Sequence, residues 1–352
     1  MCLWHNARFM RRLIDSIPVK FSFCRFQPDL LCGMNVVPAS RWLHRFAWVT
    51  ATLTLLLPVT TGAVVTTLQA GMAFPDWPSS DGYNMLAYPW LSSARDQFVE
   101  HGHRLSGLVI GLLSIALAVA TWFIETRRPA RLLALAIFGS VFMQGMLGGA
   151  RVLMDKETMA LIHGDFAAAV FSLMCVFVLV TGTEWESRPR VGDKLSLQAA
   201  FAVGVAVLVS VVIQYFLGGL LRHMKIDWAW FSHPWFALVP VALSPLFAIK
   251  ARQTGSLLLI RGANALLLLV ASQALIGLAT WYVRYGFPAW GVVAVPGSPT
   301  QVVVCSLHKV VGMLTLMTAV VNAMCAIAVR PMSDRVRVES SRLDGSMVGV
   351  AT

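Results

Sequence analysis

Long apolar stretches alternate with short charged segments along most of the chain. Each stretch approaches or exceeds the roughly 20 residues that a helix needs to cross the hydrocarbon core of a bilayer. The pattern predicts eight membrane-spanning helices, at residues 46–67, 101–124, 130–152, 158–182, 197–221, 230–249, 257–281 and 301–329. The sixth stretch is the weakest, because it is short and contains Pro240 and Pro245. Neighbouring helices can satisfy the backbone groups that such prolines free.

The composition supports a membrane protein. Hydrophobic residues make up 57% of the chain and charged residues only 13%, whereas soluble domains carry about 25% charged residues. A soluble enzyme, a secreted disulfide scaffold and a nucleic-acid-binding domain are therefore excluded. The formal charge of +11 does not indicate nucleic acid, because membrane proteins collect Lys and Arg on their cytoplasmic side. The six cysteines form no Cys-x-x-Cys pair, which argues against a disulfide framework.

The positive charges orient the predicted helices. Of the 28 Lys and Arg residues, 20 lie in the N-terminal segment, in the loops after the second, fourth and sixth helices, and in the C-terminal tail. By the positive-inside rule, both termini are predicted to be cytoplasmic. Residues 1–42 are basic and lack an apolar signal-peptide core, and residues 330–352 are polar, so both segments are predicted to be disordered tails. A mitochondrial presequence and a start at Met34 are the alternatives for the first segment.

Four of the eight histidines fall at one level of this topology. Every even-numbered helix begins at the outer face, and each carries one histidine near its start; the four are His103, His163, His233 and His308. Ionisable residues inside a membrane are costly and usually functional. Neutral imidazole is a common ligand of haem iron. We therefore predict two bis-histidine haem sites in preference to core histidines or zinc, whose ligands would converge on one point.

Internal repetition supports this interpretation. The third, fifth and seventh helices each end in a glutamine followed by a segment with glycine, which lets helices approach closely. The separation of Gln144 from His163 equals that of Gln214 from His233. His233 is therefore preferred over His223, which is assigned to a short outer loop.

The repetition also divides the chain. We predict an all-α membrane protein of two pseudo-symmetric four-helix bundles. The N-terminal half covers residues 43–182 and the C-terminal half covers residues 197–329, and each half carries one pair of the histidines. A cytoplasmic linker at residues 183–196 joins them.

Glu100 is the candidate for acid–base chemistry. It lies three positions before His103 and therefore on the same face of a helix. A carboxylate there could act as a general base or stabilise a cationic intermediate. Capping the start of the second helix, where negative charge is favourable, is an equally good explanation. His101 is expected at the membrane interface, and Arg104 is expected to pair with haem propionates or to snorkel.

The ordered set of motifs resembles the haem A synthase family, the eight-helix membrane enzymes of cytochrome oxidase assembly. The resemblance covers roughly residues 46–329. Its motifs are Thr61-Gly-Ala-Val-Val, Phe74-Pro-Asp-Trp-Pro78, Glu100-His-Gly-His-Arg104, Gln144-Gly-Met-Leu-Gly-Gly149, His163, Gln273 with Gly277 and Thr280, and His308.

The resemblance implies an oxidoreductase that converts a ring methyl of haem O into the formyl group of haem A by successive hydroxylation. It implies haem O as substrate, haem b as cofactor, and haem O synthase and cytochrome oxidase assembly factors as partners. The expected location is the cell inner (cytoplasmic) membrane, with the mitochondrial inner membrane as the alternative. No nucleic-acid partner is expected.

The resemblance also implies residue roles. His103 and His163 would bound the substrate haem, with Glu100 as the catalytic carboxylate, and His233 and His308 would ligate the haem b cofactor. Arg104 and Arg151 are expected to support propionates at the outer face.

The sequence departs from the family pattern in a few positions. Phe74 and Ser80 stand where some members carry a pair of cysteines, Pro234 follows His233, and Lys309 follows His308. A haem-binding homologue without oxidase activity and a di-haem electron-transfer cytochrome are therefore alternatives. A transporter with repeated halves is a third alternative, although transporters place polar residues near the membrane midplane.

Overall fold

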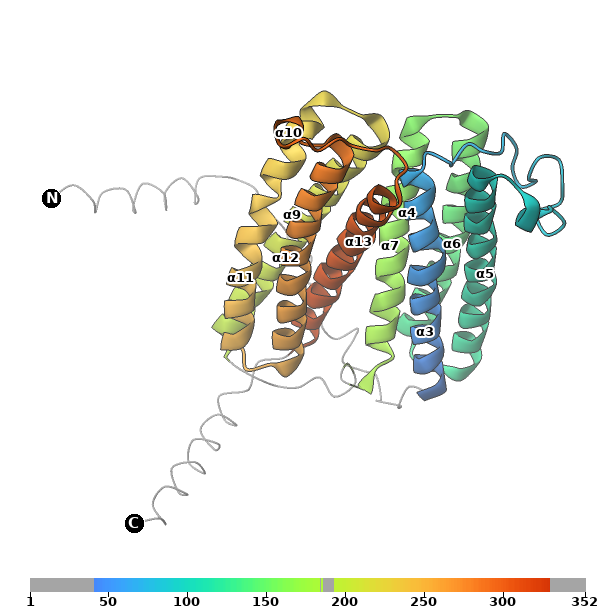
Figure 1. Cartoon of the computed structure of the whole chain (residues 1–352). Coiled ribbons are helices and arrows are strands. Elements are labelled where there is room, and N and C mark those ends of the chain that lie inside the picture. Colours follow the sequence, from blue (N-terminus) through green and yellow to red (C-terminus); the bar gives the residue numbers. More distant parts are fainter. Residues whose placement is uncertain (1–40, 184, 186–192, 330–352) are drawn as a thin grey trace, which may run out of the picture. The chain divides into compact units, whose positions relative to one another are not determined.

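The computed structural model describes residues 41–183, 185 and 193–329. Its helices are α3 (Arg41–Thr54), η1 (Leu55–Val59), α4 (Thr60–Thr67), η2 (Trp90–Ser92), α5 (Arg95–Ile124), α6 (Arg128–Met154), α7 (Glu157–Val180), α9 (Lys194–Gly219), η3 (Leu220–Met224), α10 (Asp227–Phe236), α11 (Leu238–Gln253), α12 (Leu257–Tyr285), η4 (Pro288–Trp290) and α13 (Pro299–Ala328). Within the described residues they form eight spans that are long and apolar enough to cross a membrane (Figure 1). The predicted all-α, eight-span architecture is confirmed.

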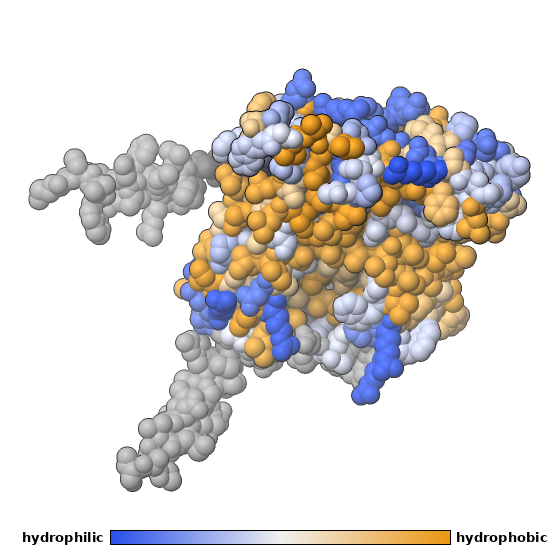
Figure 2. All heavy atoms as spheres, viewed as in Figure 1, coloured by the Kyte–Doolittle hydropathy of each residue, from blue (hydrophilic) through white to orange (hydrophobic). Residues whose placement is uncertain are grey.

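On the face of the molecule shown in Figure 2, apolar side chains form a belt across the spans, with polar residues gathered toward the two ends. Large hydrophobic side chains are exposed along this belt, for example Leu112 at 60% and Phe142 at 63%. Such a surface would be unfavourable in water and is favourable against lipid tails. The chain is therefore a multi-pass membrane protein.

Several predicted segments lie partly or wholly outside the described residues. The tail predicted at 1–42 is described only from Arg41, where α3 begins, and the tail at 330–352 is outside the description. The linker predicted at 183–196 is described only in part, and its last residues belong to α9. The cytoplasmic location of both termini and the pseudo-symmetry of the halves stay predictions.

Prolines shape two of the spans. Pro58 cannot donate a helical hydrogen bond, and the first span widens into the π-helical turn η1 around it. The Thr60 hydroxyl donates to the carbonyl of Leu55 at 2.8 Å, which satisfies the widened turn. The sixth span breaks at Ala237, between α10 and α11, three residues before Pro240. The break agrees with the weakness of this stretch in the sequence.

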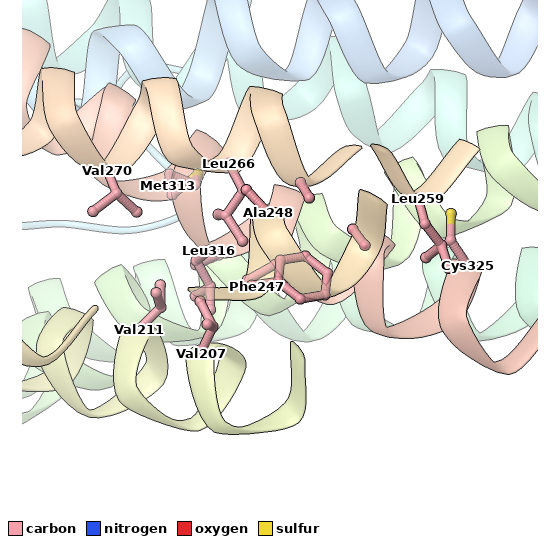
Figure 3. Packing of buried hydrophobic residues seen from close by; sticks show 14 of the residues in the cluster. Val207, Val211, Phe247, Ala248, Leu259, Leu266, Val270, Met313, Leu316 and Cys325 are labelled. Carbon is pink, nitrogen blue, oxygen red and sulfur yellow. The ribbon is translucent and has the colours of Figure 1, made fainter. Parts of the chain in front are cut away.

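Three hydrophobic clusters hold the described spans together, and the largest one connects the two predicted halves. Phe247 is fully buried in it (Figure 3), and a Cβ at Gly204 would lie 2.9 Å from its ring. Glycine at this position therefore lets α9 and α11 approach closely. The same core contains Val59, Ala168 and Phe171 from the first half. The last span, α13, packs against α7 and α4, so the halves share buried surface.

A buried ion pair between Glu125 and Arg127 stabilises the short loop between α5 and α6. The Glu125 carboxylate accepts hydrogen bonds from the Arg127 side chain at 2.6 and 3.0 Å and from its backbone amide at 2.9 Å. Burial alone would raise the pKa of Glu125, but the hydrogen bonds and charge of Arg127 outweigh burial and lower the pKa. The ionised carboxylate therefore stabilises the fold.

We predict that this contribution is lost in acid. A carboxyl group whose pKa is lower in the folded than in the unfolded state stabilises the fold above its unfolded pKa, here 4.5, and ceases to do so as the pH falls through the folded pKa. The melting temperature of the wild type in detergent should therefore fall more steeply below pH 4.5 than that of Glu125→Gln. Parallel pH profiles of the two proteins would contradict this role.

Candidate functional site

The four predicted histidines form two pairs, one in each half. The ring centres of His103 on α5 and His163 on α7 lie 6.3 Å apart, with an angle of 88° between the planes. The ring centres of His233 on α10 and His308 on α13 lie 6.2 Å apart, with an angle of 89°. The two pairs are thus nearly identical in these measures, and each brings together helices far apart in the sequence.

A glycine on a neighbouring span faces each of the four imidazoles. A Cβ added to any of these glycines would lie between 2.8 and 3.2 Å from the Cε1 atom of the facing ring. Contacts this short would displace the ring. Each histidine ring therefore fits only because the facing residue is a glycine, which has no side chain. The pairs are Gly62 with His103, Gly148 with His163, Gly218 with His233, and Gly277 with His308.

Three glutamines hold the backbone at the histidines. The Nε2 atom of each donates a hydrogen bond to the carbonyl oxygen of one histidine, at 2.9 Å for two and 3.0 Å for the third. The bonds join Gln144 to His163, Gln214 to His233, and Gln273 to His308. The repeated glutamines seen in the sequence therefore fix the helix segments that carry three of the four imidazoles.

His103 is held by a hydroxyl instead. The Thr61 hydroxyl donates to the carbonyl of Leu57 at 2.7 Å, so its oxygen can accept from Nδ1 of His103, 3.1 Å away. That tautomer leaves the Nε2 lone pair of His103 free to bind a metal ion. The widened turn η1 immediately precedes Thr61 and Gly62, and π-helical turns are frequent at functional sites.

A cavity of about 530 Å³ surrounds the first pair, within the range typical of ligand sites. The Gly71, Trp77 and Pro78 residues of the loop after the first span line it. Its other walls come from α3, η1, α4, α5, α6 and α7, together with residues of η3 and α13. The site is thus built between spans and lies beside the loop at one end of the bundle.

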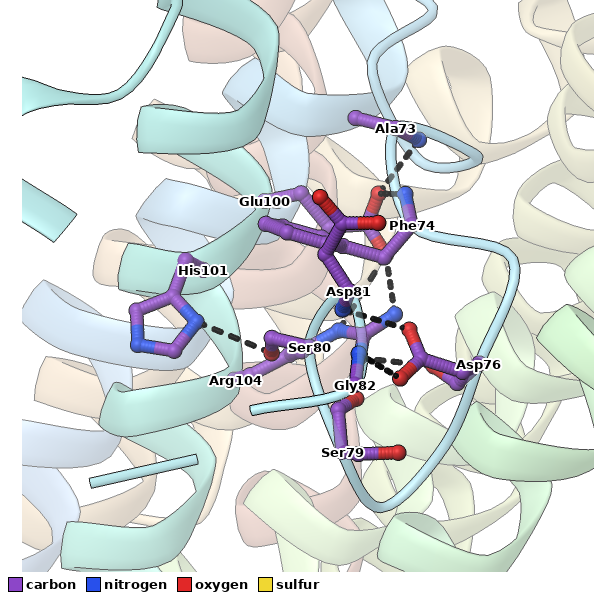
Figure 4. Close-up of polar contacts among 10 residues, drawn as sticks. All are labelled: Ala73, Phe74, Asp76, Ser79, Ser80, Asp81, Gly82, Glu100, His101 and Arg104. Atoms are coloured by element: carbon purple, nitrogen blue, oxygen red, sulfur yellow. Dashed lines mark hydrogen bonds and ion pairs between the residues drawn. The ribbon is translucent and has the colours of Figure 1, made fainter. Parts of the chain in front are cut away.

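Glu100 lines this cavity and is firmly held (Figure 4). Its Oε1 accepts from Arg104 at 2.7 and 3.2 Å, and its Oε2 accepts from the backbone amides of Ala73 at 2.7 Å and Phe74 at 3.3 Å. The capping explanation is wrong, because α5 begins at Arg95 and Glu100 lies beyond its first turn. Instead, the carboxylate anchors the preceding loop to α5.

Arg104 serves the same loop. Besides Glu100, it donates to the carbonyl oxygens of Asp76 at 2.9 Å and Ser79 at 2.7 Å. The Asp76 carboxylate in turn accepts from the amides of Asp81 and Gly82 (Figure 4). Burial would raise the pKa of Asp76, but hydrogen bonds from Ser79 and these amides outweigh it and lower the pKa. Arg104 therefore has few donors left for a propionate.

The sequence led us to expect His101 at the membrane interface, but this prediction is wrong. It is 1% exposed, and its Nδ1 lies 3.1 Å from the Ser80 hydroxyl. Its ring packs against Phe74 and Tyr88. Phe74 and Ser80, the two positions at which some family members carry cysteines, are thus buried and hold the loop by packing and hydrogen bonding.

The placement of His223 in an outer loop was also wrong. It lies in the π-helical turn η3, and its Nε2 would lie 3.1 Å from a Cβ at Gly164, next to His163. With Lys309 and Met313 it brings the second half into the wall of the first cavity. The sequence does not reveal these residues, because helix periodicity predicts neither the π-helical turn at His223 nor the face of α13 that meets the other half.

Arg151 lies at the cavity wall, near the loop. Its guanidinium presses against Gly71, where any Cβ would overlap it, and it interacts electrostatically with Glu100. A cation at this position could receive an anionic group of a ligand. Asp165, for which the sequence indicates no role, faces Gly219 and does not line this cavity.

The spacing of the two pairs fits imidazoles on opposite sides of one metal ion. Metal–imidazole bonds are about 2.0–2.1 Å long and the nitrogen lies about 1.2 Å from the ring centre, which puts two such ring centres roughly 6.4 Å apart. Across residues 41–183, 185 and 193–329, no three His, Cys, Asp or Glu side chains gather as a structural zinc site requires. Two trans imidazoles are the ligand set of six-coordinate haem.

We predict that breaking the Glu100–Arg104 pair is costly. Both side chains are almost completely buried, and removing one partner of a buried pair costs about 3 kcal/mol because it leaves the other charge uncompensated. Glu100→Gln and Arg104→Gln should both lower the melting temperature and expose residues 71–94 to limited proteolysis. Asp96→Asn, at an exposed acid on the same helix, should do neither. Wild-type stability in both variants would show that the loop is anchored elsewhere.

The chain is similar to known proteins over part of its length. The family model for cytochrome oxidase assembly proteins, COX15-CtaA, matches residues 90–237. A haem A synthase of Symbiobacterium thermophilum is 27% identical over 219 residues, which cover 59% of this chain and 69% of that protein. A haem A synthase of Brucella ovis is 29% identical over 144 residues, which cover 38% of this chain and only 40% of that protein. Over these parts of its length, the chain is therefore similar to proteins of the haem A synthase family.

Proposed function

We propose that the protein is a haem A synthase that oxidises a ring methyl of haem O to the formyl group of haem A. The observation that carries this proposal is the pair of matched imidazole gaps, 6.3 and 6.2 Å between ring centres, each opposite glycines. Similarity to haem A synthases suggests the reaction, and the two gaps support a flat macrocycle lying between helices in each half.

The first pair is assigned to the substrate. Of the two histidine pairs, only the first borders the cavity that Glu100 and Arg151 also line. A macrocycle bound there would contact both a carboxylate and a cation. His103 and His163 hold it from opposite sides, and Arg151 receives a propionate. Arg104 positions Glu100 and has a smaller part in binding propionates, because its donors are used within the protein.

The second pair is assigned to haem b, which supplies a one-electron redox centre when bound. His233 and His308 hold it, and Gln214 and Gln273 fix the backbone at these two ligands. Nδ1 of His308 is buried without a hydrogen-bond partner. This imidazole is therefore the one of the four whose orientation depends most on what it binds.

Glu100 is assigned to the chemistry at the methyl group. Four hydrogen bonds fix its carboxylate at the cavity wall, so it needs no reorganisation when positive charge develops beside it. It can also accept a proton as water adds to the oxidised carbon. In each of two successive hydroxylations, water would supply the oxygen and the carbon would lose two protons and two electrons, the electrons passing to an external electron acceptor. Loss of water from the resulting gem-diol would then give the formyl group.

The proposed setting follows from the charges. With the inner loops on the cytoplasmic side, both histidine pairs lie toward the extracytoplasmic face of the cell inner membrane; a mitochondrial inner membrane is the alternative. Haem O synthase, which makes the substrate, and cytochrome oxidase assembly factors, which receive the product, are the proposed partners.

A di-haem electron-transfer cytochrome is the second candidate. It is favoured by the observation that anchoring the loop accounts for every hydrogen bond of Glu100. A cytochrome would need the four histidines but no carboxylate chemistry, so the two candidates differ in what Glu100 does.

We predict that each imidazole pair holds its own haem. His163→Ala should lower the haem content of the purified protein from about two to about one per chain, because one axial ligand of a bis-imidazole site is lost; His308→Ala should do the same for the other site. A pyridine haemochrome assay measures the content. His44→Ala, outside both pairs, should leave it unchanged. Absence of haem from the wild-type protein would contradict both proposed haem sites.

Co-expression with a haem O source, followed by mass analysis of extracted haems, tests the reaction. The wild type should yield haem A, whereas Glu100→Gln should reduce the yield by about 100-fold or more, the size expected for a lost acid–base or electrostatic group. Arg104→Gln is the matched control, because it breaks the same ion pair but keeps the carboxylate. Because Arg104 positions Glu100, a partial loss is expected in Arg104→Gln. A loss in Glu100→Gln no greater than that partial loss would assign Glu100 a structural role and favour the cytochrome.

A further inference from the structure

The cavity around the first histidine pair extends far beyond the pair, along α5. Its lining on this helix runs from Glu100 to Ile115, which corresponds to about 22 Å at 1.5 Å per residue. At the loop end the lining is polar, and at the deep end it consists of residues such as Leu112, Ile115 and Phe138. The cavity is therefore long, with one polar and one apolar end.

The wall between α5 and α6 is open to the outside of the protein. Residues of both helices that line the cavity are also exposed on the lipid-facing surface, with Leu112 60%, Phe142 63% and Met146 43% exposed. A side chain can contact the cavity and the outer surface together only where the wall is one residue thick. The cavity thus reaches the bilayer at the level of the apolar belt.

Glycines keep this wall thin. A Cβ added at Gly107, Gly111 or Gly145 would meet no atom within 4 Å, and all three residues line the cavity. They differ from Gly62 and Gly148, whose missing side chains make room for imidazoles. No packing contact requires glycine at the first three positions, and larger residues there would narrow the gap between α5 and α6.

The charges of the cavity select the orientation of a ligand. Glu100 is paired with Arg104, and Lys309 interacts electrostatically with Asp165, so Arg151 leaves the polar end with a positive balance. Carboxylates are favoured at that end, while an apolar chain is favoured along the deep end and against lipid. The cavity therefore fits an amphiphile with anionic groups at one end and a long apolar chain at the other.

We propose that the gap between α5 and α6, lined by Gly107, Gly111 and Gly145, is a lateral opening through which the cavity takes its substrate from the bilayer and in which the apolar tail of that substrate lies. The proposal rests on the proposed function for the identity of the ligand. Haem O carries a long isoprenoid chain that haem b lacks, so the opening distinguishes the two macrocycles by their tails.

Narrowing the opening tests the proposal. Gly111→Leu and Gly145→Leu add side chains into open space, so they should not disturb the fold. Gly139→Leu is the matched control, since Gly139 lies on α6, also has nothing within 4 Å and does not line the cavity. Each protein, purified in nanodiscs, is mixed with vesicles containing haem O or haem b, and haem uptake at the His103 pair is followed by its Soret absorbance in a His233→Ala background.

Gly111→Leu and Gly145→Leu should take up haem O about tenfold more slowly or more weakly than the wild type. Their uptake of haem b, and the uptake of either haem by Gly139→Leu, should stay within about twofold of the wild type. Wild-type behaviour of both gap variants toward haem O would overturn the proposal. An equal loss of both haems would overturn it as well, because the tail would then not be what the gap recognises.

A second measurement tests the opening without haem. Ser114 is fully buried and lines the cavity, so the photoreactive residue p-benzoylphenylalanine at position 114 can reach lipid only if acyl chains enter. Mass spectra should show phospholipid adducts at position 114. Adducts are also expected at the lipid-exposed position 112, the positive control, but not at the exposed first-turn position 96, the negative control. No adduct at position 114 would show a closed wall. If the wild type binds no haem but adducts form, the proposed function fails and the opening stands.

Discussion

The structure depends on glycines that make room for imidazole rings between the helices. A histidine ring inside a helix bundle needs room that neighbouring side chains would normally fill, and each of the four rings lies where the facing helix has no side chain. Close packing of protein interiors makes this a strict requirement. The gaps between paired rings are uniform because the same arrangement is used four times, with glutamines holding three of the backbones.

Much of this arrangement could be predicted from the chain. The eight spans follow from hydropathy alone, and the equal separations of Gln144 from His163 and of Gln214 from His233 indicated which histidines match. The hydrogen bonds between these residues give the separations a physical cause. A local interaction at constant spacing leaves a repeat in the sequence, which is why this part of the site was visible there.

The rest depended on contacts that leave no such repeat. His101 and Glu100 are neighbours in sequence, but one packs among loop aromatics and the other bonds to loop amides, and neither partner is set by helix periodicity. His223 is turned into the cavity by a π-helical turn, which shifts every following side chain relative to a regular helix. The helix start at Arg95 escaped prediction because its first turns are polar and lie outside the apolar stretch.

The sharing of residues between the halves has a consequence for biosynthesis. Lys309 and Met313, which help to line the first cavity, are on α13, which leaves the ribosome after the other seven described spans. Until that span has inserted, the first imidazole pair faces an incomplete wall, and the core around Val59 and Ala168 lacks its partners on α13. A nascent chain would therefore have His103 and His163 in the membrane well before the wall of their cavity is complete, and loading of a macrocycle would follow the insertion of α13.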